Sequence, residues 1–530
     1  MSLPLLLLLV AGLKTAPAPK PRLIVVITVD QLRPDYLERY RSQLRGGLAD
    51  LLRQGAYFAD AYQDHAVTET APGHATVLSG RWPVHTGIIS NAVGVNDDTP
   101  LLEVKGPGAS PARFRGTTLF DWLKAAEPNA RALSVSGKDR GAIVTIGRAR
   151  EQVYWYRSGI FTTSRYYADA LPAWVRAFNA RRIPFRAAGR VWMLLLPERA
   201  YPEPDRVPYE NGGSDVAFPH RLPDDSAQAA DALTRIPTMD SLTLAFALEG
   251  VRMLQLGGRG ATDVLAVGLS ATDAVGHDYG PDSREIHDQV LRLDRYLGWF
   301  LQQIFLRYGK GNVVVVLTAD HGVTPLPERS RAVGRRGAVR VTPDSIVGDV
   351  NAALHAQVGD DGGDDGGDDG GGDWLEFDAG MLLVRDRATL SSRDVNVDSV
   401  IAEVAARLRA LRGVARVDRP ADLALRDTTD ALVRRWRHSL PPDAGVELVV
   451  TLTSYSTWGY EGGLVAMHGQ PNEFDTRVPI IFWGRGVRRG LHRNRVSTVD
   501  IAPTLARLLG LTPAEPVDGR VLREALEPRT

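Results

Sequence analysis

Two runs of consecutive β-branched and aliphatic residues restrict most strongly the folds that this chain can adopt. They are LIVVITV at Leu23–Val29 and VVVVL at Val313–Leu317. Such runs, without polar alternation, are typical of strands buried on both faces of a parallel sheet. Further strands of this sheet are expected at Ala132–Val135, Val264–Leu269, Leu448–Thr451 and Pro479–Trp483.

Helical patterns alternate with these strands. Alternating strands and helices predict a parallel sheet that is covered by helices on both faces, with ligands bound beyond the carboxyl ends of the strands. The sequence therefore predicts an α/β fold, a three-layer α/β/α sandwich with a largely parallel central sheet. The expected helices are at Pro34–Arg53, Thr238–Leu256, His287–Leu306 and Val499–Leu509.

Two stretches interrupt the pattern and are predicted to be insertions. Residues from about 147 to 237 are rich in aromatic residues, Arg and Pro, so a cap is expected there rather than part of the sheet. A second insertion is expected at about 326–446, with helical patterns at Val400–Leu411 and Thr428–Arg437. Within it, the GDD/DGG repeat at 359–373 cannot bury apolar surface and is expected to be a solvated loop.

The first 20 residues have the pattern of a secretory signal peptide. An apolar run from Leu3 to Leu13 precedes small residues and prolines, and it is too short to span a bilayer. The remaining residues, 21–530, are expected to form one catalytic domain with the two insertions. We therefore expect a periplasmic or secreted protein without stable membrane insertion; a short membrane anchor is the alternative.

The lack of cysteine limits the chemistry open to this chain. Without cysteine there are no disulfides, thiolate metal sites or Cys nucleophiles, so any metal must be held by Asp, Glu and His. The 63 basic residues balance the 63 acidic ones, and no net field attracts nucleic acid. The Arg cluster between Arg329 and Arg340 lacks interleaved aromatic residues, so a solvated surface is expected there rather than a nucleic-acid site.

The segment TETAPGHATVLSG, at Thr68–Gly80, is a candidate anion-binding turn. Pro72 suits the first turn of a helix, which places Thr70 at or just before the helix N-terminus. Free backbone N–H groups and the positive end of the helix dipole favour a phosphate at that point. A threonine hydroxyl there is placed to attack a phosphoryl group, although on this segment alone a plain helix cap is the commoner role of Thr70 or Thr68.

Acidic and histidine residues stand where the expected strands end or in the loops that lead into them. Each one alone is a weak signal, but together they supply three carboxylates and three imidazoles. This is enough for two divalent ions with mixed N/O ligands, which suits zinc. Two metal ions about 4 Å apart can polarise a phosphoryl oxygen and activate a hydroxyl. The residues are Asp30, Asp273, His277, Asp320, His321 and His468.

Seven motifs follow one another along the chain from Asp30 to Gly510. They are VDQLRPDYL, TETAPGHATVLSGRWPVHTGIISN, SGKDRGAI, SATDAVGHDYG, LTADHG, HGQPNEFDTRVPIIF and VSTVDIAPTLARLLG. In this order they resemble the alkaline phosphatase superfamily, and most closely the PafA-type, phosphate-irrepressible bacterial alkaline phosphatases. The resemblance covers the catalytic core and implies the α/β/α sandwich of that superfamily.

The resemblance also implies the role of each site residue. Thr70 would be the nucleophile, forming a phosphothreonine that water later hydrolyses, and it would bind the second zinc ion as an alkoxide. The implied ligands of the first zinc ion are Asp273, His277 and His468. The implied ligands of the second are Asp30, Asp320 and His321.

Three further positions bear on the substrate. Asn91 matches the phosphate-contacting Asn of the family, and Lys138 and Arg140, in GKDRG, match the pair that holds the other phosphate oxygens. A phosphomonoester dianion has one more charged oxygen than a diester, so two extra cations favour the monoester. His74 and His85 are expected to orient the turn, and Asp35 and Asp475 are candidate partners of the metal ligands.

The expected function is therefore hydrolysis of small-molecule phosphate monoesters by an alkaline phosphatase. The nearest alternative is a phosphodiesterase or nucleotide pyrophosphatase with the same metal framework, in which Trp155, Tyr156 and Tyr166–Tyr167 of the cap would stack on a base. A catalytically silent phosphate-binding relative fits less well, because every expected position is filled. A sulfatase is disfavoured because the chain lacks the Cys or Ser motif that its modified nucleophile requires. The sequence indicates no oligomeric state.

Overall fold

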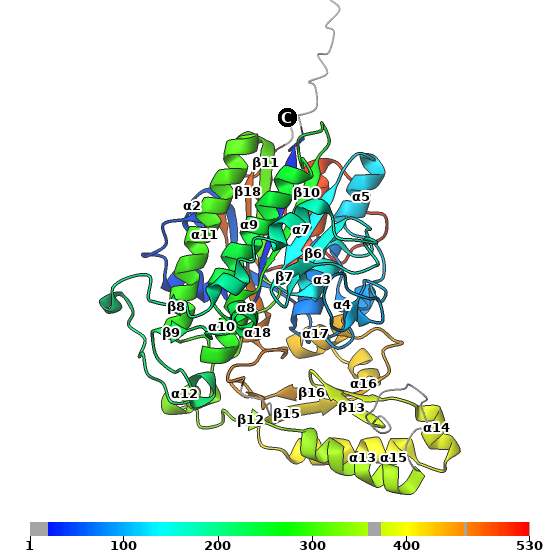
Figure 1. The fold of residues 1–530 in the computed structure, drawn as a ribbon. Coiled ribbons are helices and arrows are strands. Elements are labelled where there is room, and N and C mark those ends of the chain that lie inside the picture. Colours follow the sequence, from blue (N-terminus) through cyan, green and yellow to red (C-terminus); the bar gives the residue numbers. More distant parts are fainter. Residues whose placement is uncertain (1–19, 359–372, 460–463, 529–530) are drawn as a thin grey trace, which may run out of the picture.

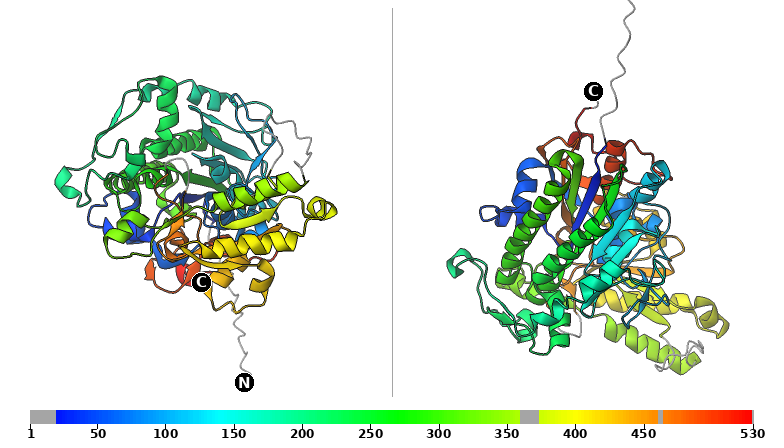
Figure 2. Two further views of the ribbon diagram at one scale, coloured as in Figure 1. Left: turned by 90° about the horizontal axis from the view of Figure 1, so that it is seen from below. Right: turned by 45° about the horizontal axis from the view of Figure 1, so that its top comes forward.

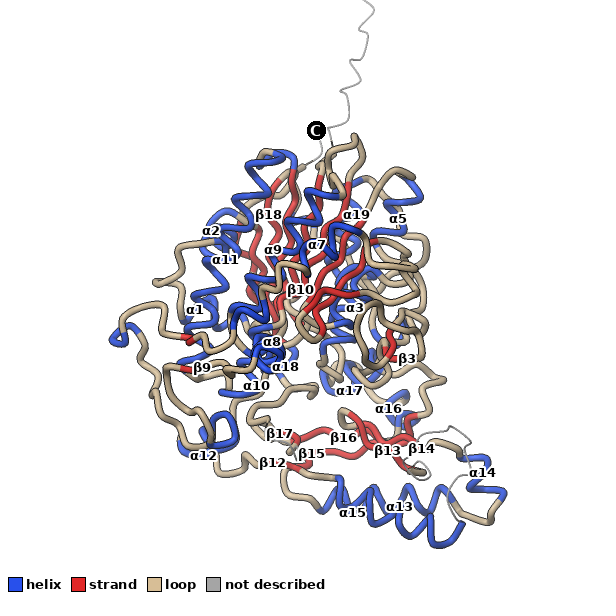
Figure 3. Tube along the Cα trace, viewed as in Figure 1, coloured by secondary structure: helices blue, strands red, loops and turns tan. Residues whose placement is uncertain are grey.

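The computed structural model describes residues 20–358, 373–459 and 464–528. The expected signal peptide, apart from its last residue, and the expected Asp/Gly loop, apart from Asp373, lie outside the described residues. A large body contains a central sheet between two layers of helices, and a smaller unit lies at one end of that sheet (Figure 1, Figure 3).

The central sheet has ten strands and is largely parallel, as predicted. Its order is β19-β2-β18-β11-β1-β10-β5-β6-β7, and β20 also pairs with β2. Only β18 and β7 run against the other strands of this sheet. The strands are β1 (Leu23–Val29), β2 (Ala56–Tyr62), β5 (Ala132–Ser136), β6 (Gln152–Arg157), β7 (Ile160–Thr162), β10 (Asp263–Leu269), β11 (Val313–Thr318), β18 (Arg477–Gly484), β19 (Gly490–His492) and β20 (Val496–Ser497).

The register of the three central strands brings their carboxyl ends to one edge. Thr28 of β1 is paired with both Gly268 of β10 and Thr318 of β11. The residues that follow these strands therefore emerge side by side, at the edge that faces the smaller unit (Figure 1). This edge is the place where the sequence predicts ligand binding.

Alternate residues of the central strands contribute to two separate hydrophobic cores, one on each face of the sheet. The long helix α11 lies along one face, as the right-hand view of Figure 2 shows. The helices of that face are α1 (Pro34–Arg39), α2 (Gly47–Gln54), α7 (Ala173–Asn179), α9 (Thr238–Met253), α10 (Ala271–Tyr279) and α11 (Arg284–Tyr308). The helices of the other face are α3 (Thr70–Ser79), α5 (Leu119–Ala126), α6 (Asp139–Ile143) and α19 (Ile501–Leu509).

The single helix expected at Pro34–Arg53 is wrong, because α1 and α2 are separate. At the start of α2 the backbone meets α11 so closely that a Cβ on Gly46 would lie 2.1 Å from the Asp294 carbonyl oxygen. The Asp294 carboxylate accepts hydrogen bonds from the backbone N–H groups of Arg45 and Gly46, at 2.7 and 2.6 Å. This contact between distant segments fixes a new helix start.

The predicted cap is also partly wrong. Strands β6 and β7 extend the central sheet, although their aromatic residues had suggested an insertion. The later part of the stretch covers the α10–α11 side of the body and contains β8 (Val191–Trp192), β9 (His220–Arg221) and α8 (Ser226–Ala232). It is held partly by Asp288 of α11, whose carboxylate accepts hydrogen bonds from Trp192 Nε1 at 2.7 Å and from the Tyr201 hydroxyl at 2.6 Å.

The smaller unit has its own antiparallel sheet, in the order β13-β14-β16-β15. The segment Leu448–Thr451 belongs to this sheet, within β16, and its predicted place in the central sheet is wrong. Helices α13 and α15 pack on one face of this sheet (Figure 2, left). The opposite face packs against Ala66 and Val67, in the loop before α3. The elements are α13 (Asp344–Val358), β13 (Leu375–Asp378), β14 (Met381–Val384), α14 (Arg387–Ser392), α15 (Val397–Ala410), β15 (Val414–Asp418), α16 (Pro420–Ala424), α17 (Ala431–Ser439) and β16 (Val446–Leu452).

Across the three described ranges, no helix combines the length and apolarity needed to cross a membrane.

Candidate active site

Thr70 is the first residue of α3, at the edge where the central strands end. All ten residues of this helix are buried, and Thr70 is 1% exposed. Gly73 allows the first turn of α3 to approach the chain after β11, since a Cβ there would lie 2.2 Å from the Asp320 carbonyl oxygen. The helix N-terminus is thus held against the residues that follow β11.

The two threonines of the turn differ in their hydrogen bonds. The Thr68 hydroxyl donates to the Gln470 carbonyl oxygen at 3.0 Å and accepts from the Gly469 N–H at 3.2 Å. The Thr70 Oγ1 atom lies 3.3 Å from Lys138 Nζ, its one hydrogen-bond partner among the described residues. Thr68 therefore ties two loops together, whereas the hydroxyl of Thr70 is available for chemistry.

The six predicted metal ligands all lie around this point. Asp30 follows β1, Asp320 and His321 follow β11, and His468 lies in the loop before α18 (Glu473–Thr476). Asp273 and His277 are four residues apart in α10, so they share one face of that helix. Their spacing in the sequence was a signal of this shared face.

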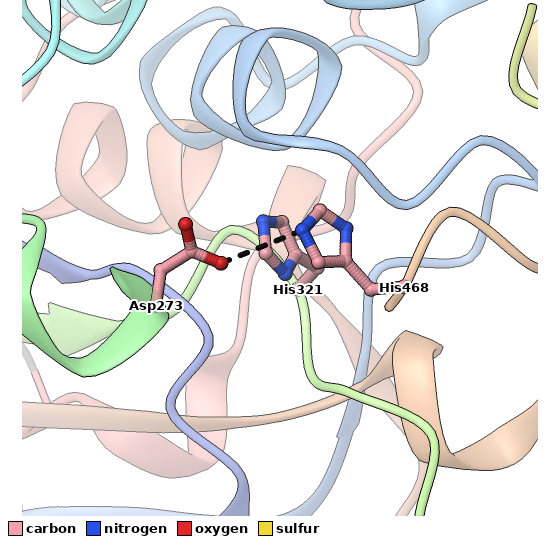
Figure 4. A group of neighbouring side chains, drawn as sticks. All are labelled: Asp273, His321 and His468. Carbon is pink, nitrogen blue, oxygen red and sulfur yellow. Dashed lines mark ion pairs between the residues drawn. The ribbon is translucent and has the colours of Figure 1, made fainter. Parts of the chain in front are cut away.

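Two groups of these side chains are compact enough to hold a metal ion, with ligand atoms within 4.8 Å of one another. One consists of Asp30, Asp320 and His321, and the other of Asp273, His321 and His468. Figure 4 shows the second group, in which His468 Nε2 lies 3.4 Å from Asp273 Oδ1. His277 Nε2 lies 3.2 Å from the same oxygen. His321 therefore belongs to both groups, which adds it to the ligands expected around Asp273.

The three histidines are oriented alike by backbone carbonyls. The Nδ1 atom of each donates to a carbonyl oxygen: His277 to Ala466 at 2.6 Å, His321 to Gly322 at 2.9 Å and His468 to Thr68 at 2.8 Å. This bond orients each ring so that its Nε2 atom faces the carboxylates, and a neutral imidazole held in this way has its Nε2 lone pair available for a metal ion. Metal-binding histidines need this arrangement.

Several buried acceptor atoms between these groups have ion-pair neighbours but no hydrogen-bond partner among the described residues. They are both carboxylate oxygens of Asp30, Asp320 Oδ2 and His321 Nε2. Burial and the neighbouring Asp30 carboxylate raise the pKa of Asp320 well above its ordinary value. Burial and nearby His321 lower the pKa of His468 to about 3, which keeps its imidazole neutral. Buried carboxylates that lie this close together are costly unless cations neutralise them, so this donor set fits divalent cations.

Two further cations and an amide lie on the nucleophile side of the cluster. Lys138 Nζ contacts Asp30 Oδ2 and lies 2.6 Å from Asp273 Oδ2. Arg140, in α6, has a buried Nε atom without a hydrogen-bond partner among the described residues. Asn91 Oδ1 accepts the Ala71 N–H at 3.0 Å, which leaves the hydrogens of its Nδ2 group as donors.

The other candidate positions divide between the site and the surface. His74 Nε2 lies 3.5 Å from Asp320 Oδ2, so His74 is closer to the metal ligands than its expected role in the turn required. Asp475 accepts from Thr324 Oγ1 at 2.7 Å and from the Gln470 N–H at 3.0 Å, which joins the loops that carry His321 and His468. Asp35 instead pairs with arginines, and half-exposed His85 pairs with Asp518.

Sequence reasoning missed two residues next to the site. Glu69 accepts the Asn91 N–H at 2.6 Å, and burial with nearby Asp378 raises its pKa to about 7. Its position directly before Thr70 was the one available signal. Gln31 contacts two of the carboxylates, through the backbone to Asp320 and through the side chain to Asp273. Its position directly after Asp30 carried no comparable signal.

Proteins of known activity are similar to this chain over nearly its whole length. The profile of the type I phosphodiesterase / nucleotide pyrophosphatase family matches residues 24–442. Alkaline phosphatase PhoK of a Sphingomonas species is 33% identical over 537 residues, covering 95% of this chain and 91% of PhoK. Alkaline phosphatase PafA of Elizabethkingia meningoseptica is 28% identical over 543 residues, covering 97% of this chain and 96% of PafA. A crystal structure of wild-type PafA matches this fold with a TM-score of 0.86 and 26% sequence identity, covering 97% of this chain and 100% of the PafA chain.

Proposed function

This chain belongs to the type I phosphodiesterase and nucleotide pyrophosphatase family of the alkaline phosphatase superfamily, and we propose that it cleaves phosphate monoesters. It is an enzyme of the alkaline phosphatase type. In this proposal, hydrolysis proceeds at a two-zinc site through a phosphothreonine at Thr70. The observation that carries the proposal is the position of the Lys138 ammonium, whose Nζ lies 3.3 Å from Thr70 Oγ1.

The metal ions would be held by the two groups of carboxylates and imidazoles. His277 would add a ligand beside Asp273, and His321 belongs to both groups. When bound, two such ions supply positive charge that lowers the pKa of a nearby hydroxyl and neutralises phosphoryl and leaving-group oxygens. The mixed nitrogen and oxygen donors favour zinc over magnesium or calcium.

Thr70 carries the covalent step. The Thr70 hydroxyl would give its proton to solvent water, and Oγ1 would attack phosphorus to form the Oγ1–P bond. The bond from phosphorus to the ester oxygen would break with its electron pair on that oxygen, which takes a proton from water as the alcohol leaves. Water then attacks the phosphothreonine, which releases phosphate and returns the hydroxyl to Thr70. The N-terminus of α3 is suited to the phosphate, because the positive end of its dipole favours an anion.

Lys138, Arg140 and Asn91 are proposed to hold the phosphoryl oxygens that the metal ions leave free. The buried Nε–H of Arg140 has no acceptor among the described residues, and a phosphate oxygen would supply one. The Asn91 amide, fixed by its bond to Ala71, has its Nδ2 hydrogens left to donate. A transition state that spreads charge over three equatorial oxygens gains from every such donor, and a diester offers one charged oxygen fewer.

A phosphodiesterase remains the alternative, and the cap aromatics no longer favour it. Trp155 and Tyr156 lie in β6 and are 1% and 4% exposed, so they do not present a face to a nucleobase. The Tyr166 hydroxyl is bonded to the Arg148 carbonyl oxygen at 2.8 Å, and its ring lies under Arg150. The aromatic support for base binding is therefore weak.

The proposal is tested by comparing kcat/KM for an aryl phosphate monoester with kcat/KM for the matching bis-aryl diester, with zinc supplied. We expect a ratio well above one, because the two extra cations recognise the additional charge of the monoester. A ratio below one would assign the protein to the phosphodiesterases. No turnover of either ester by zinc-loaded protein would instead support the silent relative.

Removal of metal is expected to abolish activity and to lower the melting temperature. Without divalent ions, the buried carboxylates of Asp30, Asp273 and Asp320 repel one another, and ligand binding to the folded state alone stabilises it. Dialysis against a chelator, followed by scanning calorimetry and an assay of aryl phosphate hydrolysis, measures both effects. Zinc should restore both, whereas magnesium, which prefers oxygen ligands, should not. Full activity in the chelated protein would contradict the metal site.

The proposed setting is the periplasm or the exterior of the cell, with small phosphate monoesters as partners. The support is the apolar pattern of the first 20 residues. An alkaline phosphatase in that setting would release inorganic phosphate from esters that reach it by diffusion.

A further inference from the structure

Gln31 has an unusual backbone conformation at the centre of the candidate site. It directly follows Asp30 and is 0% exposed, with φ at 63°. A residue with a Cβ is uncommon in the left-handed region, and such a conformation costs of order 1 kcal/mol. A buried residue that keeps this conformation is held there by its surroundings.

The left-handed turn directs the two donors of Gln31 to two different carboxylates. The backbone N–H donates to Asp320 Oδ1 at 3.1 Å, and the side-chain Nε2 donates to Asp273 Oδ1 at 2.7 Å. The His321 N–H also donates to Asp320 Oδ1, at 3.0 Å. The other oxygen of Asp320 accepts no hydrogen bond from the described residues and lies 3.5 Å from His74 Nε2. Asp320 belongs to one candidate metal group, and Asp273 belongs to the other.

The orientation of the Gln31 carboxamide is fixed by charge. Its oxygen, if it were turned toward Asp273, would meet a carboxylate oxygen, so the Nε2 group must face Asp273. The Oε1 atom then points at α10, where none of the described residues donates a hydrogen bond to it. It fits there because residue 276 is glycine: a Cβ on Gly276 would lie 1.8 Å from Gln31 Oε1.

We propose that Gln31 is a positioning residue for both metal groups, with its main chain holding Asp320 and its side chain holding Asp273. Gly276 is part of the same arrangement, because it provides the space for the Gln31 carboxamide. The inference rests on the proposed two-metal site. Partners that orient metal ligands typically change metal affinity or activity by about 10- to 100-fold when they are removed.

The variant Gln31→Gly removes the side chain and keeps the backbone N–H in a conformation that glycine adopts freely. We expect zinc affinity at the Asp273 group to fall by about 10- to 100-fold, while affinity at the Asp320 group stays within about 3-fold. Zinc titration calorimetry of chelated protein, with cobalt spectra as a second readout, separates the two sites. Equal losses at both sites, or none, would overturn the proposal.

Gly276→Ala is the matched second variant. The added methyl should push the Gln31 carboxamide away from Asp273, and so produce the same selective loss of zinc affinity. Alanine favours a helix over glycine by about 1 kcal/mol, so the metal-free protein should not lose stability. In the double variant the methyl meets empty space, and the two losses should not add. Additive losses would overturn the proposal.

The zinc titration of the wild-type protein distinguishes a failure of the proposed role of Gln31 from a failure of the proposed two-metal function. If the wild-type protein binds two zinc ions and both single variants bind them equally well, only the role of Gln31 fails. If the wild-type protein binds no pair of zinc ions, the proposed function and the role of Gln31 fail together.

Discussion

Replacement of Thr70 by alanine is expected to lower kcat/KM for an aryl phosphate monoester by about 10⁴-fold or more, since removal of a covalent nucleophile is among the largest single losses in enzymes. Zinc binding should remain, because the proposed ligands around Thr70 are carboxylates and imidazoles that keep their own supports. His468, for example, is oriented by the Thr68 carbonyl oxygen, which the substitution leaves in place. Steady-state kinetics and zinc content by atomic absorption measure the two quantities.

Two control variants make this result specific. Thr70→Ser keeps a hydroxyl at the start of α3 and should retain most of the activity. Thr68→Val removes the hydroxyl that contacts Gly469 and Gln470, so it should loosen the His468 loop and weaken zinc binding without removing the nucleophile. Activity of Thr70→Ala near the wild-type level would refute the phosphothreonine at this position. Zinc loss equal to the activity loss would make Thr70 a structural residue.

The parts of the fold that sequence could predict are those fixed by local pattern. β1 matches its predicted bounds, because seven consecutive apolar or β-branched residues leave no other assignment. α3 begins at Thr70, where Pro72 and the hydroxyl residues placed a helix start. These elements depend on burial and backbone preference, which nearby residues express in full.

The parts that failed depend on contacts between distant segments. β16 has the composition of a buried central strand, yet it pairs with β14 and β15 in the smaller unit. β2 was not predicted, because AYFADAY contains a charged residue, although the strand joins the edge strands to β18. Periodicity tells whether a strand is buried and does not tell which sheet buries it.

The candidate site was predictable in its chemistry and less so in its geometry. The proposed ligands Asp30, Asp273 and Asp320 follow parallel strands, which collect their carboxyl ends at one edge, so their convergence followed from topology. Topology did not predict that His321 belongs to both groups, and it did not predict the contact of Lys138 with Asp30. Those depend on side-chain directions that only the packed loops determine.

Lys138 should determine the preference for monoesters. Its Nζ atom lies between Thr70 Oγ1 and the carboxylates of Asp30 and Asp273, so its charge is close to both the proposed nucleophile and two proposed metal ligands. We expect Lys138→Ala to lower kcat/KM for the aryl monoester by about 10²- to 10³-fold, because a charged donor to a transferring phosphoryl oxygen contributes a few kcal/mol in a water-excluded site. For the matching diester we expect a loss of about 10-fold or less.

The comparison of the two substrates separates charge recognition from general damage. Lys124→Ala is the matched control, since Lys124 has a 42% exposed side chain paired with Glu151 and should leave both activities unchanged. Zinc content must be measured in the same preparation, because Lys138 also balances two carboxylates that would hold metal. Equal losses on monoester and diester with zinc retained would mean that Lys138 acts on the nucleophile rather than on substrate charge. A selective loss on the monoester would place the discrimination between the two ester classes in the ammonium beside Thr70, rather than in the cap.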